Sequence, residues 1–313
     1  MVEVETRLER EAAGAKLEPS EAEAKILEHA WWMKKQGYKE STIRVRVGTL
    51  KRLVRVGANL SDPESVKAAI AGLDNSENTK WQISLMYRCF ASTNHITWTP
   101  PNYAFTRKIP FIPLESEIDA LIAGCGRKTA TILQLIKETG MRVGEVRRLN
   151  WTDLDLENNT IRVNSPEKGS NPRIFKISSK LVAMLNALPK SNGFNLKIFQ
   201  MAETSLRANF MQQRRRMAEK LQNPRLVQIT FHTLRHWKAT MEYHRTRDIL
   251  HVKQLLGHKS IENTMLYTQL ISFESDEYSS AVAKSLDEAR KLVEGGFEYV
   301  TDMDGHKLFR KRK

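Results

Sequence analysis

The stretch TPPNYAFTRKIPFIP, Thr99 to Pro113, decides how this sequence of 313 residues is divided. It contains four prolines and no helical period, a composition typical of an extended connection between domains. Helical periodicity dominates the chain on both sides of it. A chain of this length can form two domains that each bury an apolar core. The sequence therefore predicts a mainly α-helical protein of two domains, with a linker at 99–113.

The segment before the linker predicts a compact basic helical domain over residues 20–98, preceded by a flexible arm at 1–19. Ser20 and Glu23 have the form of a capping box at the start of the first helix. Further helical runs are expected from Ser41, over 64–72 and over 77–94. The run from Ser41 carries a row of basic residues, which fits both a DNA-contacting face and an ordinary solvated face. Its candidate DNA contacts are Arg44, Arg46, Lys51 and Arg52.

The segment after the linker, residues 114–272, predicts an α+β domain. Most of it has helical periodicity, but TIRV at 160–163 and RIFKI at 173–177 flank the turn-rich NSPEKGSNP. This pattern predicts a small antiparallel β-sheet containing a hairpin with a long tip. Residues 273–313 are expected to form a C-terminal helix over 276–293 and a basic tail.

The overall composition favours a polyanionic partner. Fifty Lys and Arg against 36 Asp and Glu give a net charge of +14, although a basic housekeeping protein would also fit. Cys89 and Cys125 lie far apart and form no CxxC pair, so no disulfide framework or structural zinc site is predicted. The sequence lacks a long apolar run, and we expect a cytoplasmic protein. It also lacks the phosphate-loop, HExxH and GxGxxG motifs, which removes support for nucleotide-driven, zinc-peptidase and dinucleotide-dependent chemistry.

Four separated segments hold residues suited to binding or cleaving a phosphodiester. In GMRVGEV, Gly140 ends one helix and Arg142 stands at the start of the next, where a guanidinium and free N–H groups can meet a phosphate. Glu145, three residues on, is placed to orient Arg142. Lys168 lies at the hairpin tip. Each of these residues alone is also explained by an ordinary exposed helix or loop.

The other two segments are HTLRH, residues 232–236, and LGHKSIENTMLYTQL, residues 256–270. His232 and Arg235 are three residues apart and share one helical face. His232 and His236 have the spacing of a metal pair, but no further ligand stands nearby, so no metal is expected. His258 follows a glycine, and Tyr267 comes nine residues later on an amphipathic segment, where it could equally be a packing aromatic.

Taken together, GMRVGEV, Lys168, HTLRH, LGH and Tyr267 resemble the tyrosine recombinase family, which includes phage integrases and Xer-type resolvases. The order and spacing of these motifs agree with the family over residues 113–272. The N-terminal helical segment resembles the family's core-binding domain by position and charge only, and the end GFEYVTDMDGHKLFRKRK weakly resembles tails of archaeal members.

The resemblance implies a mechanism for these residues. Arg142 and Arg235 would bind the nonbridging oxygens of the phosphodiester, and His258 would add a hydrogen bond. Tyr267 would attack the phosphorus with His232 as its base, and Lys168 would protonate the leaving 5′ oxygen. The product would be a 3′-phosphotyrosyl intermediate, formed without a metal, ATP or other cofactor.

The resemblance also implies the partners. These are double-stranded DNA at a specific recombination site and further copies of the chain, as a tetramer on the nucleoid, with the C-terminal segment docked on a neighbouring subunit. Packing of that segment on its own domain is the alternative. Residues 207–247 hold ten basic and two acidic side chains, and their candidate phosphate contacts are Arg214, Arg215, Arg216 and Lys238.

Three other functions stay open from sequence. A type IB topoisomerase uses the same chemistry on a related fold, although the HTLRH and LGH motifs argue against it. A DNA-binding relative that has lost its activity would keep the fold without the chemistry. A metal hydrolase built on His232 and His236 is distinguished from all of these because a chelator would inhibit it.

Overall fold

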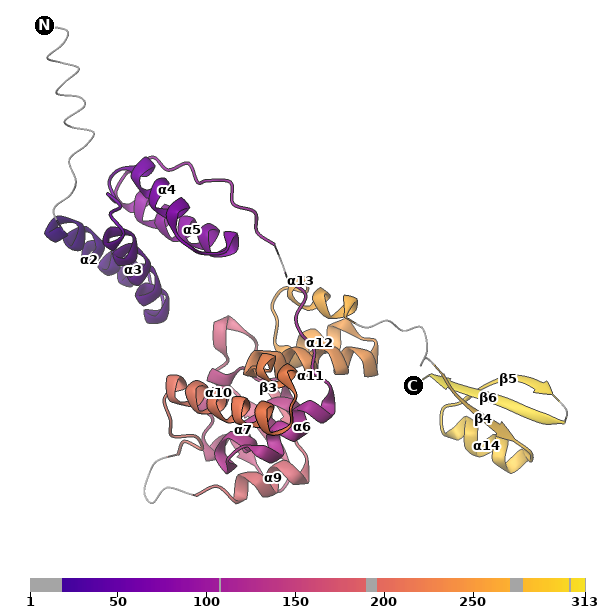
Figure 1. Cartoon of the computed structure of the whole chain (residues 1–313). Helices are drawn as coiled ribbons and strands as arrows, with labels where there is room; N and C mark the ends of the chain where they lie inside the picture. Colours follow the sequence, from indigo (N-terminus) through magenta and orange to yellow (C-terminus); the bar gives the residue numbers. More distant parts are fainter. Residues whose placement is uncertain (1–18, 107, 190–195, 271–277, 304, 313) are drawn as a thin grey trace, which may run out of the picture. The chain divides into compact units, whose positions relative to one another are not determined.

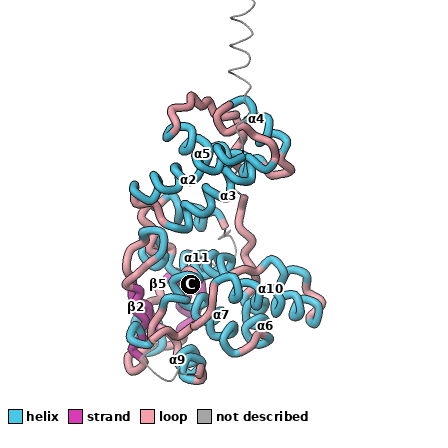
Figure 2. The backbone as a smooth tube through the Cα atoms, turned by 90° about the vertical axis from the view of Figure 1, so that its left-hand side faces the viewer, coloured by secondary structure: helices cyan, strands magenta, loops and turns pink. Residues whose placement is uncertain are grey.

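The computed structural model describes residues 19–106, 108–189, 196–270, 278–303 and 305–312. The chain divides into two units between Lys108 and Ile109, inside the proline-rich stretch at 99–113 (Figure 1). Helices make up most of both units (Figure 2). The protein is therefore mainly α-helical, with small antiparallel sheets in the second unit.

The first unit contains four described helices, α2 (Pro19–Lys35), α3 (Glu40–Arg55), α4 (Pro63–Gly72) and α5 (Glu77–Thr93). Helix α2 begins at Pro19, so the prediction that Ser20 caps it is wrong. A proline at the first helical position has a backbone angle already suited to the helix. The core joins the apolar faces of these helices, and Leu50, Leu53, Tyr87 and Phe90 are fully buried in it.

The core of the second unit is built around α7 (Arg127–Thr139), which is buried along most of its length. The helices that pack on α7 include α6 (Glu115–Gly124), α9 (Ser179–Asn186), α10 (Glu203–Lys220) and α11 (Phe231–Thr246). Because α7 is surrounded in this way, both of its ends are held rigidly. Its C-terminal end leads directly into the segment that holds Arg142.

A three-stranded antiparallel sheet has the order β1 (Leu154–Asp155), β2 (Thr160–Val163) and β3 (Arg173–Lys176). The hairpin of β2 and β3 confirms the prediction, and the two-residue β1 was not predicted. Ile161, Val163 and Phe175 point into the core at alternate positions, as expected for strands with one buried face. The hairpin tip contains the short helix η2 (Glu167–Gly169).

The remaining described elements of this part are short. They are α8 (Val143–Arg148), η1 (Trp151–Asp153), η3 (Pro224–Gln228), α12 (Ile249–Leu256), α13 (Glu262–Met265) and η4 (Leu266–Gln269). Helix α12 begins at Ile249, two residues after the end of α11 at Arg247. Arg247 ends α11 in a left-handed conformation with φ of 57°, and Asp248 caps α12 by accepting from two backbone N–H groups.

The C-terminal part differs from its prediction. A single helix over 276–293 is wrong, because Tyr278–Ala283 is strand β4 and helix α14 covers only Leu286–Glu294. Ser285 accepts a hydrogen bond from the Glu288 backbone N–H, which fixes the helix start there. The basic tail is also ordered, since β5 (Glu298–Met303) and β6 (His306–Arg312) complete a sheet of order β4-β6-β5.

We predict that Tyr87→Phe destabilises the first unit by about 1–3 kcal/mol. The Tyr87 hydroxyl donates to the Leu60 carbonyl at 2.9 Å in the buried core, and the variant leaves that carbonyl without this donor. Thermal unfolding followed by circular dichroism measures the loss. An unchanged midpoint would show that the hydrogen bond contributes nothing to stability.

Candidate active site

Arg142 stands where the sequence placed it, between two helices. Gly140 ends α7 in a left-handed conformation with φ of 65°, and Arg142 is the residue that precedes α8. Its guanidinium donates to the Ser170 hydroxyl at 2.6 Å, on the hairpin loop between β2 and β3. The side chain is 16% exposed, so one edge of the guanidinium still reaches solvent.

Glu145 lies beneath Arg142 and is the shared acceptor of the site. Its buried carboxylate accepts from the backbone N–H of Arg142 at 2.9 Å and of Glu167 at 3.1 Å, and from the Arg173 guanidinium at 2.6 Å. Burial acts to raise its pKa, but the charge of Arg173 and these hydrogen bonds outweigh burial and lower the pKa. Glu145 is therefore ionised and joins the Arg142 segment to the hairpin.

Arg173 continues this connection to the segment around His258. It donates to the Asn171 carbonyl at 3.2 Å, and the Asn171 N–H in turn donates to the Gly257 carbonyl at 3.3 Å. The sequence analysis did not identify Arg173. A signal was present, because Arg173 and Phe175 share the inward face of a strand, where an unpaired arginine would be costly.

Arg235 is 2% exposed and holds two helix ends together. It donates to the Gly140 carbonyl at 2.6 Å and to the Leu256 carbonyl at 2.8 Å, and lies 3.1 Å from Nε2 of His258. Burial and the nearby charge of Arg142 lower its pKa to about 9. Carbonyl groups satisfy its N–H donors without neutralising its charge.

His258 is held between Arg235 and Thr264. Because a guanidinium only donates, Nε2 of His258 is the acceptor, and Nδ1 faces the Thr264 hydroxyl at 3.0 Å. Burial and the charges of Arg235, Arg142 and Arg173 lower the pKa of His258 to about 4. The imidazole is therefore neutral at neutral pH in the absence of an anion.

Tyr267 is 3% exposed and packs on Ala239, Val252 and Leu256. Its hydroxyl lies 3.0 Å from Nδ1 of His236. Burial raises the pKa of Tyr267, while the charges of Arg235 and Arg142 act in the opposite direction without reversing it. The phenol is therefore protonated in this arrangement.

His236 is the site residue that sequence reasoning missed, since it was considered only as half of a metal pair. Burial, His232 and Arg235 lower its pKa to about 4, so it is neutral and able to accept a proton. His232, predicted to be the base of Tyr267, has its ring centroid 4.5 Å from that of His236. The hydroxyl of Tyr267 is thus hydrogen-bonded to the second histidine of HTLRH.

Lys168 is exposed at the hairpin tip and has φ of 54°. The pKa of His232 is lowered by burial and then by the charges of Arg235 and Lys168, which places the lysine within electrostatic range of the histidine. Lys259 is a second cation at the same tip, since its Nζ lies 3.6 Å from where a Cβ on Gly169 would stand.

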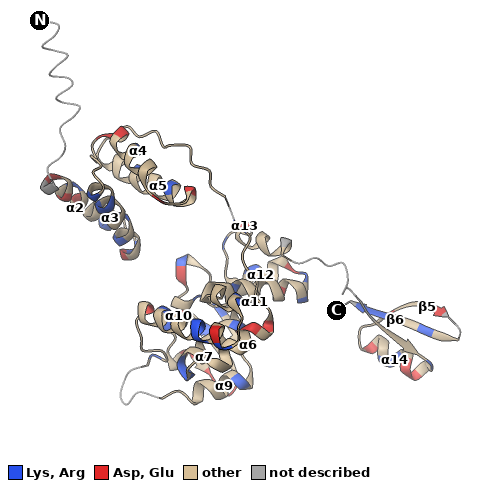
Figure 3. Ribbon diagram, viewed as in Figure 1, with Lys and Arg blue, Asp and Glu red and all other residues tan. Residues whose placement is uncertain are grey.

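The predicted DNA contacts on α3 are among the positions coloured blue in Figure 3, and they differ in their exposure and partners. Arg44 is exposed. Arg46 donates to the Cys89 sulfur at 2.8 Å and lies over the Tyr38 ring. The remaining two have surface partners, Lys51 with Glu23 at 3.8 Å and Arg52 with Asn75 at 3.0 Å.

The predicted contacts of the second unit divide in the same way. Arg215 is exposed, and Arg216 is exposed while donating to the Gly124 carbonyl at 3.0 Å. Arg214 donates to the Ile229 carbonyl and stacks over Phe210, an arrangement that favours packing over DNA contact. Lys238 is paired with Glu242 at 2.8 Å.

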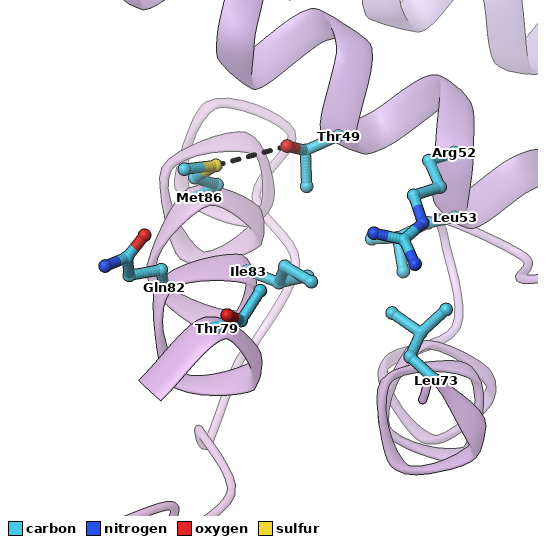
Figure 4. Close-up of a pocket in the computed structure, with 8 residues that line it drawn as sticks. All are labelled: Thr49, Arg52, Leu53, Leu73, Thr79, Gln82, Ile83 and Met86. Atoms are coloured by element: carbon cyan, nitrogen blue, oxygen red, sulfur yellow. Dashed lines mark hydrogen bonds between the residues drawn. The ribbon is translucent and has the colours of Figure 1, made fainter. Parts of the chain in front are cut away.

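Other chemistries find little support among the described residues. They contain no group of three or more His, Cys, Asp or Glu side chains placed to hold a metal ion. None of the described helices is both long and apolar enough to cross a membrane. A hollow of about 130 Å³ between α3, α5 and the end of α4 is lined by four apolar side chains, two threonines, Gln82 and Arg52, with no acid–base pair (Figure 4).

We predict that Glu145→Gln destabilises the second unit by about 3–5 kcal/mol at neutral pH, because it leaves Arg173 buried without its counter-charge. The folded-state pKa of Glu145 is lowered from 4.5, so its contribution is complete above that value and is lost as the pH falls through the lowered pKa. Denaturant unfolding from neutral pH downward should therefore show the two proteins converging in acid. A constant difference would contradict the role assigned to the charge.

We also predict that Gly257→Ala destabilises the protein by about 1–3 kcal/mol. Gly257 has φ of 67°, and an added Cβ would stand 2.5 Å from the Arg173 guanidinium and 3.1 Å from the Asn171 carbonyl oxygen. Gly48→Ala is the matched control, because Gly48 lies inside α3 with open space around its Cα. The control should be neutral or stabilising in the same thermal unfolding assay, and equal losses would contradict the steric argument.

Comparisons with known proteins identify the family. The family model described as the phage integrase family matches residues 114–272, half of the chain. Tyrosine recombinase XerA of Saccharolobus solfataricus is 28% identical over 210 residues, 65% of this chain and 69% of that protein. Tyrosine recombinase XerC of Xanthomonas campestris is 29% identical over 177 residues, so the chain spans 52% of that relative's length.

Solved structures share the fold. The integrase of transposon Tn1549, in complex with transposon right-end DNA, superposes with a TM-score of 0.61 at 14% identity and covers 87% of this chain and 98% of that one. A lambda integrase dimer bound to a COC′ core site has a TM-score of 0.61 at 17% identity and covers 82% of this chain and 79% of that one. With the family model and the residues above, these findings show that the chain belongs to the phage integrase family of tyrosine recombinases.

Proposed function

We propose that this protein is a site-specific recombinase that cleaves and rejoins double-stranded DNA through a 3′-phosphotyrosyl intermediate on Tyr267. The observation that carries the proposal is the convergence of Arg142, Arg235, His258 and Tyr267, which come from three segments far apart in sequence. The relatives named tyrosine recombinases, and the integrases solved on DNA, support a DNA substrate.

The two arginines suit the charge of the reaction. Cleavage of a phosphodiester concentrates negative charge on the nonbridging oxygens in the transition state. Burial, and then repulsion by the charge of Arg142, lower the pKa of Arg235. A phosphate between them relieves that repulsion. Their charge is therefore available to the substrate before it arrives.

The protonation and hydrogen bonding of His258 would change when a phosphate binds. An anion at this site competes for the Arg235 donor that now reaches Nε2 of His258. The negative charge also favours the protonated imidazole, which then donates from Nε2 to a phosphate oxygen while Nδ1 keeps Thr264. The neutral resting state thus becomes a hydrogen-bond donor when substrate binds.

Tyr267 would be activated by a histidine. The hydroxyl lies at hydrogen-bond distance from His236, and this contact supports His236 as the acceptor of the phenol proton, with His232 beside it. Lys168, exposed at the hairpin tip, is the cation best able to move over the leaving 5′ oxygen and protonate it. Rejoining is the reverse sequence, in which a 5′ hydroxyl attacks the phosphotyrosyl bond, so no ATP is consumed.

Self-assembly belongs to the same proposal. Exchange of strands between two DNA sites requires four cleavages, and we propose a tetramer on DNA, as the family resemblance implies. The lambda integrase in the comparison was solved as a dimer on its DNA site.

The wild-type protein is expected to form a detergent-resistant adduct with a nicked suicide duplex carrying its recombination site, and to do so in excess chelator. Tyr267→Phe should form none, because the attacking oxygen is removed. Tyr243→Phe is the control, since Tyr243 packs on the same cluster from α11. An adduct with Tyr267→Phe would reject the nucleophile. Site-independent plasmid relaxation would indicate a topoisomerase-like activity. Binding to DNA without an adduct on any duplex would indicate an inactive relative.

His236→Ala is expected to slow single-turnover cleavage by about 100-fold or more, the usual range for loss of a general base. His232→Ala should have a smaller effect, because His232 acts through its neighbour. Rates are compared at saturating protein with the same suicide duplex. A fall in cleavage rate in His232→Ala alone would show that His232 is the base.

A further inference from the structure

The loop between β2 and β3, residues 164–172, is held against α8 by an ion pair that the proposed chemistry does not use. Arg148, in the last turn of α8, donates from Nη1 to the Glu167 carboxylate at 3.0 Å. Its Nη2 donates to the Ser165 carbonyl at 3.3 Å. One guanidinium therefore holds both a side chain and the backbone of this loop.

The Glu167 carboxylate also packs closely on the backbone of α8. A Cβ added to Gly144, in the first turn of that helix, would overlap Oε1 of Glu167 and stand 2.5 Å from its Cδ. The missing side chain at Gly144 is therefore what gives the carboxylate its room. The Glu167 backbone N–H donates to Glu145 at 3.1 Å, so the main chain and the side chain of Glu167 are both fixed.

Lys168 follows Glu167 directly, and its backbone depends on these contacts. Lys168 and Gly169 are both left-handed, with φ of 54° and 66°. Such a conformation is unfavourable for a lysine, so neighbouring contacts have to maintain it. After this pair, the Ser170 N–H donates to the Glu167 carbonyl at 3.0 Å, and the Ser170 hydroxyl accepts from Arg142 at 2.6 Å. Lys168 therefore stands on a short turn that is held at both ends.

The neighbouring arginine of α8 has a different partner. Arg147 pairs with Glu203, at the start of α10, at 3.2 Å and donates to the Met201 carbonyl at 3.1 Å. The Arg147 and Arg148 pairs have similar lengths and are both partly exposed, but of the two only that of Arg148 reaches the hairpin loop. Ion pairs at this exposure contribute little to the stability of a fold, so the effect expected of the Arg148 pair is local.

We propose that Glu167 and Arg148 are positioning residues for Lys168. Their ion pair, packed on Gly144, fixes the backbone of the lysine so that its side chain reaches the leaving 5′ oxygen. The inference rests on the proposed recombinase function and concerns one step of it. In that step the Tyr267 oxygen bonds to phosphorus, and the bond from phosphorus to the 5′ oxygen breaks with its electron pair on that oxygen. The proton passes from the lysine ammonium to the 5′ oxygen, which leaves a neutral amine.

The test separates protonation of the leaving group from the rest of the reaction. Two suicide duplexes differ in one atom, which is either oxygen or sulfur at the scissile 5′ position. A thiol has a pKa of about 8.5, far below that of an alcohol, so the sulfur leaves as a thiolate and needs no proton. Single-turnover formation of the Tyr267 adduct is measured on both duplexes at saturating protein. Lys168→Ala should lose about 100-fold or more on the oxygen duplex and about 2-fold or less on the sulfur duplex.

The positioning variants should show the same pattern at smaller size. Glu167→Gln keeps the shape of the side chain and removes its charge, and Arg148→Ala removes the partner. Each is expected to slow cleavage of the oxygen duplex by about 10-fold and that of the sulfur duplex by about 2-fold or less. Arg147→Ala is the matched control, because it removes the same charge from α8 and should leave the ratio of the two rates unchanged.

Gly144→Ala tests the packing without changing any charge. The added methyl group displaces the Glu167 carboxylate, so the variant should slow the oxygen duplex selectively, as Glu167→Gln does. Adding Glu167→Ala to Gly144→Ala should cause no further loss, because both changes remove the same contact.

A purely structural role would slow both duplexes equally, and that result would overturn the proposal. A wild-type ratio in Glu167→Gln, or an equal change of the ratio in Arg147→Ala, would also overturn it. If sulfur does not restore Lys168→Ala, the lysine is not the acid and no residue positions it for that task.

Failure of the recombinase function gives a different result. If wild-type protein forms no adduct on either duplex, the recombinase function fails and this inference fails with it. If the wild-type adduct forms on both duplexes while Glu167→Gln keeps the wild-type ratio, the recombinase function stands and only the positioning role is excluded.

Discussion

The ion pair between Glu145 and Arg173 is the interaction on which the candidate active site depends. Both side chains are buried, and between them they reach the Arg142 segment, the hairpin loop and the turn before His258. A buried charge pair of this kind is weak evidence for stability but fixes geometry strongly, because losing either partner strands the other. Residues more than a hundred positions apart in sequence are aligned by this one contact.

Much of the fold and the site could be predicted from the sequence. The local signals were the helical spacing, Gly140 before Arg142 and the alternation in β2 and β3. Each of them correctly predicted the helix, turn or strand at its position. The choice between His232 and His236 could not be made in this way. Both lie on the same side of α11, and the orientation of Tyr267 toward His236 depends on packing against Ala239, Val252 and Leu256.

The C-terminal segment 278–312 shows a different limit. Its alanines, leucine and valine fit a helical period from 276 to 293, yet the first six residues pair as an edge strand with β6, thirty positions later. The local spacing of apolar residues carries no information about a strand partner so far along the chain. The Ser285 and Glu288 spacing, and the Asp304–Gly305 dipeptide between two runs rich in β-branched and basic residues, were the available signals.

The carbonyl partners of Arg235 have a thermodynamic consequence. Because Gly140 and Leu256 satisfy its N–H groups without supplying a negative charge, the folded protein without DNA holds concentrated positive charge in a buried place. Any anion that binds there stabilises the folded state and not the unfolded one. Folding of the second unit and occupation of the site are therefore linked equilibria, and resistance to unfolding reports on whether a phosphate is in place.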